Sequence, residues 1–207
     1  MRDIFRKRRM WRERPELKSG YDVVIIGGGA HGLATAYYLR ELGITDVAVL
    51  EKNYIGCGAA GRNTTILRSN YKTPEGARFY DASVKLYDGL ARDLNFNLLF
   101  SQCGHLTLAH SDRAMFVMAN RAEVNRLAGI DSRLIGPAEI QQLVPTMYVG
   151  EDTTYPIMGA LYHPPGGIIR HDAVVWGYAR GADAGGAEIH PNTEVMGLKR
   201  RGDGSRP

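Results

Sequence analysis

The stretch YDVVIIGGGAHG at residues 21–32 decides the fold of the first part of this chain. Its run of Val and Ile predicts a buried strand, and the glycines that follow predict a tight turn into a helix. A second apolar run, VAVL at 47–50, predicts another strand and is followed by Glu51, 19 residues after Gly32. A strand, a glycine turn, a helix, a strand and an acid in this register predict a dinucleotide-binding βαβ unit.

The glycines of the turn have distinct expected roles. Gly27 permits the tight turn, Gly29 lets the backbone approach a pyrophosphate, and Gly32 lets the helix pack closely on the strand. The first N–H groups of the helix favour phosphate, and Glu51 is placed to accept hydrogen bonds from ribose hydroxyls. The alternative to nucleotide binding is a glycine-rich turn with a purely structural role. Such a turn would not need a helix, a second strand and an acid at these spacings.

The positive charge of the chain is concentrated near its N-terminus. The net charge is +4 at pH 7, but eight of the 26 Lys and Arg residues and three of the 22 Asp and Glu residues lie in residues 1–20. The remainder carries 18 basic and 19 acidic residues, so we expect no nucleic-acid surface there. We expect the basic arm, residues 1–20, to be a solvated, poorly ordered terminus, with contact to an acidic partner as the alternative.

Composition places the chain among globular proteins of one or two domains, with 207 residues, 44% hydrophobic residues and 25 glycines. Arg8 and Arg9 are not followed by an apolar segment, and no stretch is long enough to predict a transmembrane helix. Cys57 and Cys103 have neither metal-type spacing nor the pattern of a disulfide framework, and no metal site is expected. A cytoplasmic location is therefore expected.

Periodicity and turn residues divide the rest of the chain into short elements. The expected helices are 30–42, 75–94, 112–127, 137–143 and 173–184, and the expected strands are 98–100, 105–109, 156–163, 187–190 and 194–198. The strands 98–100 and 105–109 suit a hairpin joined at Gly104, and Asp112 and Asp172 are the expected helix N-caps. The early part is thus parallel α/β, and the last helix and strands return to the first domain.

The βαβ unit alone does not distinguish NAD from FAD, but the segment after Glu51 does. A glycine-rich loop at 55–61 leads into the polar run Arg62 to Thr65, which suits a backbone wrapped around a flavin nucleotide. With this run the chain resembles the FAD-dependent oxidoreductases of the D-amino-acid oxidase type, and among them the β subunits of heterotetrameric sarcosine oxidases. The residues that carry the resemblance are 27–37, 43–52, 62–71, 99–102, 155–160 and 167–172.

The resemblance implies an α/β fold, with a Rossmann-like FAD-binding domain and an incomplete mixed α+β substrate domain. The expected domains are the basic arm 1–20, the FAD-binding domain 21–75 and 165–207, and the substrate-binding part 76–164. The residues expected to line FAD are Gly27, Gly29, Ala30, His31, Gly32, Glu51, Arg62, Asn63, Thr64, Thr65 and Val195.

Two further residues receive specific roles from the resemblance. Arg68 matches a family arginine that pairs with the substrate carboxylate, a role that suits the planar fork of a guanidinium; an ordinary surface or phosphate-side arginine is the alternative. His171 matches a histidine that is covalently joined to FMN, a second flavin. The alternative for His171 is a partly buried histidine in a turn, with its hydrogen bonds satisfied.

The implied reaction is the oxidative demethylation of sarcosine. Electrons would pass from FAD to the covalent FMN and then to O2, and the companion α, γ and δ subunits are the implied partners. Such enzymes are considerably longer than this chain, so we expect a C-terminally truncated fragment with an open sheet edge and no activity on its own.

Three other functions remain open from the sequence. One is a single-flavin amine or amino-acid oxidase or dehydrogenase of the glycine oxidase kind, which would lack covalent FMN. Another is a non-catalytic flavodomain remnant that binds a nucleotide weakly. An NAD-dependent dehydrogenase is the third, and the run from Arg62 to Thr65 disfavours it.

Overall fold

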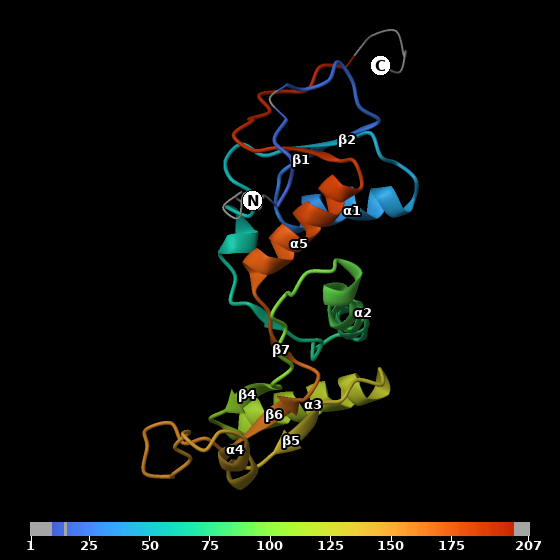
Figure 1. The fold of residues 1–207 in the computed structure, drawn as a ribbon. Coiled ribbons are helices and arrows are strands. Elements are labelled where there is room, and N and C mark those ends of the chain that lie inside the picture. The colour runs from blue at the N-terminus through green and yellow to red at the C-terminus, as the bar shows by residue number, and fades with distance from the viewer. Residues whose placement is uncertain (1–9, 15, 201–207) are drawn as a thin grey trace, which may run out of the picture. The chain divides into compact units, whose positions relative to one another are not determined.

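A computed structural model describes residues 10–14 and 16–200 of the chain, which form two units (Figure 1). Among the described residues, unit 1 comprises those within 10–64, 91–98 and 170–200, and unit 2 comprises 65–90 and 99–169. The expectations for Arg8 and Arg9, and for the parts of the arm 1–20 and of the domain 165–207 that fall on residues 1–9, 15 and 201–207, lie outside the described residues. The assignment of one FAD-binding and one substrate-binding domain stays a prediction.

In its described part, unit 1 is built on a three-stranded parallel sheet. The order of its strands is β1 (Val23–Ile26), β2 (Val47–Leu50) and β8 (Glu188–His190). Val23 is paired with Val47, and Val49 is paired with Ile189. Val47, Ala48 and Val49 are buried because β2 is the central strand and is covered on both faces. The predicted parallel α/β arrangement is confirmed.

Two helices of unit 1 pack side by side, α1 (Ala30–Glu41) and α5 (His171–Ala184) (Figure 1). Their contact is close because α5 carries small residues: a Cβ on Gly181 would lie 2.7 Å from the Tyr37 ring. Tyr37 also lies against Tyr178, with ring centroids 5.8 Å apart. The helix predicted for 30–42 is confirmed to within one residue.

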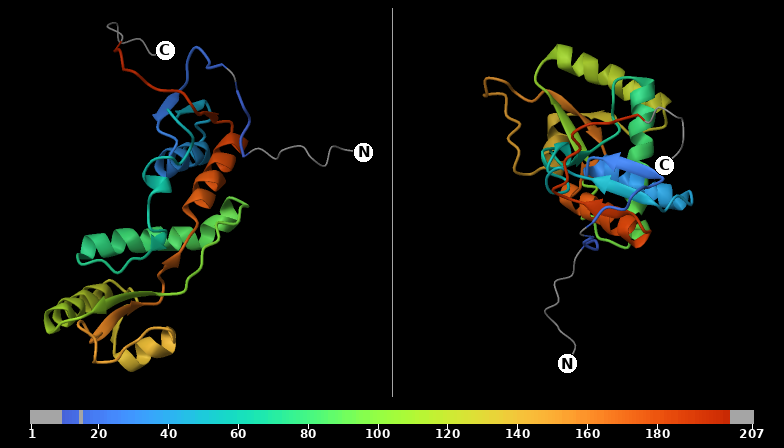
Figure 2. Two further views of the ribbon diagram at one scale, coloured as in Figure 1. Left: turned by 90° about the vertical axis from the view of Figure 1, so that its left-hand side faces the viewer. Right: turned by 90° about the horizontal axis from the view of Figure 1, so that it is seen from above.

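The described residues of unit 2 contain a three-stranded antiparallel sheet in the order β4 (His105–Ala109), β6 (Gly159–His163), β5 (Arg133–Ile135). Alternate residues of β6 face opposite sides, so Leu161 packs with Met118 of α3 (Asp112–Leu127) and Ala160 packs with Ile140 of α4 (Pro137–Leu143). Figure 2 shows both helices lying on this sheet. The expected mixed α+β unit is confirmed.

The described residues form four further elements. They are the short helix η1 (Ala59–Gly61), the strand β3 (Ile66–Leu67), the long helix α2 (Pro74–Asp93) and the strand β7 (Gly167–Ile168). β3 pairs with β7 in antiparallel fashion inside unit 2. The helix predicted for 75–94 is confirmed to within one residue.

Several local predictions are wrong. β4 does not form a hairpin at Gly104 but pairs with β6, His105 lying opposite His163. In the described chain neither 98–100 nor 194–198 forms a strand. Ser111 rather than Asp112 caps α3, because its Oγ accepts the N–H of Ala114 at 3.2 Å. A serine one residue earlier reaches the same helix donor, so the helix begins at the expected place.

The described part of the basic arm is largely exposed, but three of its basic side chains pair with carboxylates of unit 1. Arg12 Nε lies 3.3 Å from Asp183 Oδ1, and Arg12 Nη2 donates to the Asp183 carbonyl at 2.8 Å. Arg14 and Lys18 each lie 3.3 Å from Oε1 of Glu188. Glu188 is a buried carboxylate in β8, and a buried charge needs partners. The Arg12 and Lys18 side chains are still 63% and 49% exposed, so this part of the arm is solvated and is also held by ion pairs that the sequence does not predict.

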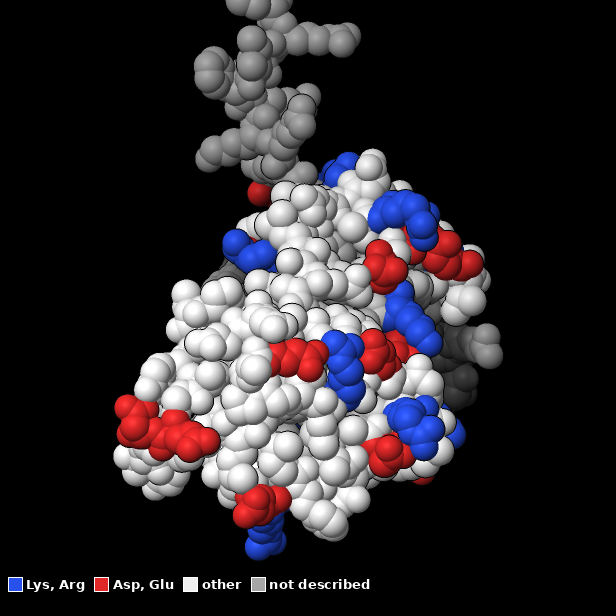
Figure 3. Space-filling view, turned by 90° about the horizontal axis from the view of Figure 1, so that it is seen from below, with Lys and Arg blue, Asp and Glu red and all other residues white. Residues whose placement is uncertain are grey.

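Charges on the face seen in Figure 3 are interspersed, and no extended basic patch gathers there. Among residues 10–14 and 16–200, the structure has no helix whose length and apolar character would let it cross a membrane.

Candidate functional site

The glycine turn between β1 and α1 combines a tightly packed glycine, Gly32, with an open position at Gly29. Gly27 has a φ of +111°, a conformation that suits glycine. A Cβ on Gly32 would overlap the carbonyl oxygen of Gly27, so this position needs glycine for packing. At Gly29 the situation is opposite, because a Cβ there would meet no atom within 4 Å. Gly32 is therefore packed against the turn itself, whereas the space beside Gly29 is open.

The N-terminus of α1 is free to receive an anion. Gly29 is the N-cap, no described side chain caps the helix, and its first turn contains no acidic residue. Its first backbone N–H groups therefore retain hydrogen-bonding capacity, and the helix dipole favours negative charge there. The side chain of His31 is exposed in this turn. These features fit the diphosphate of a dinucleotide.

Glu51 is held against the glycine turn. Its Oε2 accepts the backbone N–H of Gly28 at 2.8 Å, and its Oε1 accepts the backbone N–H of Asn53 at 2.9 Å. Burial raises the pKa of the Glu51 carboxyl, but the donors Asn53, Gly28 and Cys57 outweigh burial and hold that pKa below its ordinary value. Glu51 is therefore an ionised acceptor in the folded chain at neutral pH.

The segment after β8 runs alongside the residues that follow β2. The N–H of Thr193 donates to the Glu51 carbonyl at 2.8 Å, and the N–H of Asn192 donates to the Asn53 carbonyl at 2.9 Å. Val195, half-buried, follows in this segment. Three parts of the sequence, the glycine turn, Glu51 and residues 192–195, thus meet at the carboxyl edge of one parallel sheet, where open α/β sheets bind ligands.

One residue of the run from Arg62 to Thr65, Thr65, has an unusual backbone conformation. Asn63 Nδ2 donates to the Ala60 carbonyl at 2.6 Å, while Arg62 and Thr64 are exposed. Thr65 has a φ of +61°, which is rare for a β-branched residue and costs about 1–3 kcal/mol. Strain of this kind concentrates at ligand sites.

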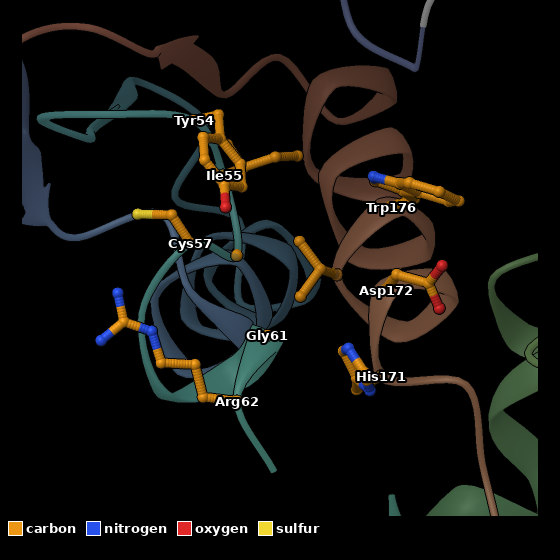
Figure 4. A pocket seen from close by; sticks show the side chains of 10 residues that line it. Tyr54, Ile55, Cys57, Gly61, Arg62, His171, Asp172 and Trp176 are labelled. Carbon is orange, nitrogen blue, oxygen red and sulfur yellow. The ribbon is translucent and has the colours of Figure 1, made fainter.

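A cavity of 460 Å³ lies in unit 1 between the loop after β2 and the start of α5 (Figure 4). Its volume is in the range of small-molecule sites. The lining residues are Tyr54, Ile55, Gly56, Cys57, Gly61, Arg62, His171, Asp172, Val175 and Trp176.

His171 is the first residue of α5 and lines this cavity. Its Nδ1 atom is buried and has no hydrogen-bond partner among the described residues. The predicted Asp172 cap is wrong, because Arg170 is the N-cap residue and its guanidinium takes the Asp172 carboxylate, at 3.0 and 2.6 Å. Arg170 holds the pKa of Asp172 below its ordinary value. The alternative of a histidine with satisfied hydrogen bonds does not describe His171 Nδ1.

Arg68 lies in unit 2, next to β3. Its Nη1 donates to Asn70 Oδ1 at 3.1 Å, and its guanidinium carbon lies 4.5 Å from the centroid of the Tyr71 ring. Tyr71 stacks on Tyr80 with centroids 3.9 Å apart. No carboxylate of the described residues forms an ion pair with Arg68. The sequence reasoning found Arg68 but missed Asn70, which lies two residues away and carries no motif of its own.

His163 is buried in unit 2 and has partners on both ring nitrogens. Nδ1 lies 2.7 Å from the Asp131 carbonyl, so it must be the donor, and Nε2 lies 3.2 Å from the Ser69 backbone nitrogen and accepts its N–H. Burial lowers the pKa of His163. It is a neutral core histidine that fixes the segment next to Arg68.

Comparison with protein families finds a match over most of the chain. The model of the family described as FAD dependent oxidoreductase matches residues 22–206. The sarcosine oxidase subunit beta of Rhizobium meliloti (strain 1021) is 52% identical over 191 residues, which are 92% of this chain and 45% of that protein. The corresponding subunit of an Arthrobacter species is 46% identical over 190 residues, 91% of this chain and 47% of that protein.

A solved structure shows the same fold. The L-proline dehydrogenase of P. horikoshii superposes with a TM-score of 0.82 at 27% identity, over 90% of this chain and 48% of that one. The chain spans about half the length of the curated relatives it matches.

Proposed function

This chain belongs to the family of FAD-dependent oxidoreductases, and from that premise we propose that it carries the FAD site of a sarcosine oxidase β subunit. The observation that carries the proposal is the glycine turn, in which Gly32 is tightly packed and the space beside Gly29 is open, followed by a helix that no described side chain caps. Its similarity to curated β subunits favours sarcosine, N-methylglycine, as the amine.

In this proposal residues of unit 1, together with Thr65 at the start of unit 2, bind and orient FAD. The N–H groups at the start of α1 hold the diphosphate, and the Glu51 carboxylate accepts hydrogen bonds from ribose hydroxyls. His31 contributes its backbone, Val195 contacts the adenine end, and the strained run Arg62 to Thr65 follows the rest of the flavin nucleotide. FAD, when bound, supplies the acceptor for the hydride equivalent that leaves the N-methyl carbon.

Arg68 is the proposed anchor for the substrate carboxylate. A guanidinium binds a carboxylate with two parallel hydrogen bonds and so fixes the orientation of the amine. Its support is the absence of an ion pair between Arg68 and any carboxylate of the described residues. A charged residue left without a protein counter-ion is suited to an anionic ligand.

His171 is the proposed attachment point of FMN as a second, covalent flavin. The buried and unpartnered Nδ1 and the 460 Å³ cavity support this role. Electrons from FAD would then leave through FMN to O2. Acid precipitation tests the attachment: flavin colour should stay with the wild-type protein and be released from His171→Ala. Release from both proteins would favour a single-flavin enzyme of the glycine oxidase kind.

The other subunits of the enzyme, α, γ and δ, are proposed partners because the relatives are named as subunit beta. Because we propose that this chain is inactive on its own, the experiment for the function as a whole is anaerobic addition of sarcosine to the flavin-loaded protein assembled with its proposed partner subunits. Bleaching of the flavin band by sarcosine supports the proposal. A protein that holds flavin but is bleached by no secondary amine would instead support the non-catalytic flavodomain reading.

A further inference from the structure

Two arginines of unit 2, within the described residues, converge on one neutral side chain. Asn70 is fully buried, and its Oδ1 lies 3.1 Å from Arg68 Nη1 and 3.1 Å from Arg121 Nη2. Arg121, on α3, also donates from Nε to the backbone carbonyl of Asn70. Because both guanidiniums can only donate, the Asn70 amide must present its oxygen to them. Arg121 therefore holds Asn70 at two points, and Asn70 holds Arg68.

The positive charge of this cluster is not compensated within the described chain. Neither guanidinium has an ion pair with a carboxylate there. Burial lowers the pKa of Arg121, and the charge of Arg68 lowers it further. Nearby His105 adds no charge at neutral pH, because burial and Arg68 lower its pKa to about 4. Two half-buried cations held at one oxygen repel each other, and an anionic ligand relieves that repulsion.

We propose that Asn70 and Arg121 are positioning residues that aim the Arg68 guanidinium at the substrate's carboxylate. The inference rests on the proposed function of Arg68 and adds the residues that act through it. Asn70 occupies one end of the Arg68 fork and so fixes its plane, which a bidentate carboxylate contact requires. Arg121 supplies the second positive charge that draws the anion.

The test uses acetate as the simplest carboxylate, titrated into the flavin-free chain and followed by the backbone amide NMR signals of residues 68–71, which every variant retains. We expect saturable shifts in the wild type and a loss of affinity of about tenfold in Arg121→Met, as for a lost charge-assisted hydrogen bond. Arg121→Lys should restore part of the affinity, since it keeps the charge but not the fork. The control is Arg126→Met on the same helix, which removes an exposed arginine paired with Glu123.

A second variant keeps the inference testable if Arg121→Met does not fold. Asn70→Asp has nearly the same shape and places a carboxylate between the two guanidiniums. We expect it to remain folded and to lose acetate binding, because the internal carboxylate replaces the ligand. Undiminished acetate affinity in folded Arg121→Met or in Asn70→Asp would overturn the inference.

The anchoring role of Arg68 and the positioning role of Arg121 can be tested separately. If Arg68→Met leaves acetate affinity unchanged, the proposed role of Arg68 is wrong. If Arg68→Met abolishes binding but Arg121→Met does not weaken it, the anchor stands and the positioning role is wrong. In the assembled enzyme, a positioning role predicts a raised KM for sarcosine in Arg121→Met with kcat nearly unchanged.

Discussion

The Oε2 atom of Glu51 lies 2.8 Å from the backbone nitrogen of Gly28, so the acid that follows β2 and the glycine turn that follows β1 are one structural unit. The carboxylate accepts two backbone N–H groups in a buried position. A residue that the sequence places as a ribose ligand therefore also stabilises the turn that would hold the diphosphate.

Replacing Glu51 with Gln should weaken both the fold and the cofactor site. The amide has one acceptor oxygen, so one backbone N–H loses its partner, at a cost of about 1–3 kcal/mol in the free energy of unfolding. Urea unfolding measures the loss, and FAD titration measures the weaker binding. The matched control is Glu41→Gln, at the exposed end of α1 beside Arg40. Equal effects of the two substitutions would contradict the role of Glu51.

Two glycines of the same turn should respond differently to alanine. Gly29→Ala should change the free energy of unfolding by less than about 0.5 kcal/mol, since its Cβ enters open space. It should weaken FAD binding by about tenfold or more, since the backbone must approach the pyrophosphate there. Gly32→Ala should cost about 1–3 kcal/mol because its Cβ overlaps the Gly27 carbonyl. Unfolding curves and FAD titration of both variants check this; unchanged FAD affinity in Gly29→Ala speaks against a pyrophosphate at this turn.

The buried Glu188 should make stability fall in acid. Burial raises its pKa, but hydrogen bonds from Tyr21, His190 and Lys18 outweigh burial and hold the pKa below its ordinary value. A lowered folded-state pKa contributes stability that is present above the unfolded pKa and is lost as pH falls through the folded value. The urea midpoint should therefore fall between pH 7 and a pH below 4.5, and the fall should be larger in the wild type than in Glu188→Gln. The control is Glu194→Gln, at an exposed position; a Glu188→Gln profile that matches the wild type would refute this account.

His105 should add a second pH dependence at higher pH. Burial, followed by the charge of Arg68, lowers its pKa from 6.5 to about 4. As the pH falls, His105 is therefore protonated in the unfolded chain before it is protonated in the folded chain. The free energy of unfolding falls as the pH falls from 6.5 toward 4. His105→Asn should flatten the stability profile in that window. An NMR titration of the His105 ring with a midpoint near 6.5 would rule this out.

The local part of the fold was predictable because its signals are local. The turn, α1, β2 and Glu51 lie within residues 21–51, and glycine spacing and apolar runs determine them. The pairing of β4 was not predictable from such signals, because its partner His163 lies far along the chain from His105 and no turn motif joins the two strands. Asp172 was misjudged for a related reason, since the preceding Arg170 competes for its carboxylate.

The candidate site shows the same limit. Resemblance identified Arg68 and His171, and each occupies an environment suited to a ligand. Asn70 and Arg121 could not be found from sequence because they meet only when α3 packs in unit 2 and brings together residues 51 positions apart. The binding of the arm to Glu188 was also hidden, because basic residues near a terminus predict solvation unless a buried acid in a distant strand pairs with them.

The central claim, that the glycine turn of this chain holds FAD, is tested most directly by equilibrium titration of the chain with FAD, followed by flavin fluorescence and repeated with excess NAD as competitor. The account predicts saturable binding of one FAD per chain that NAD does not displace. Binding of NAD in place of FAD, or no binding of either nucleotide by the folded chain, would contradict it.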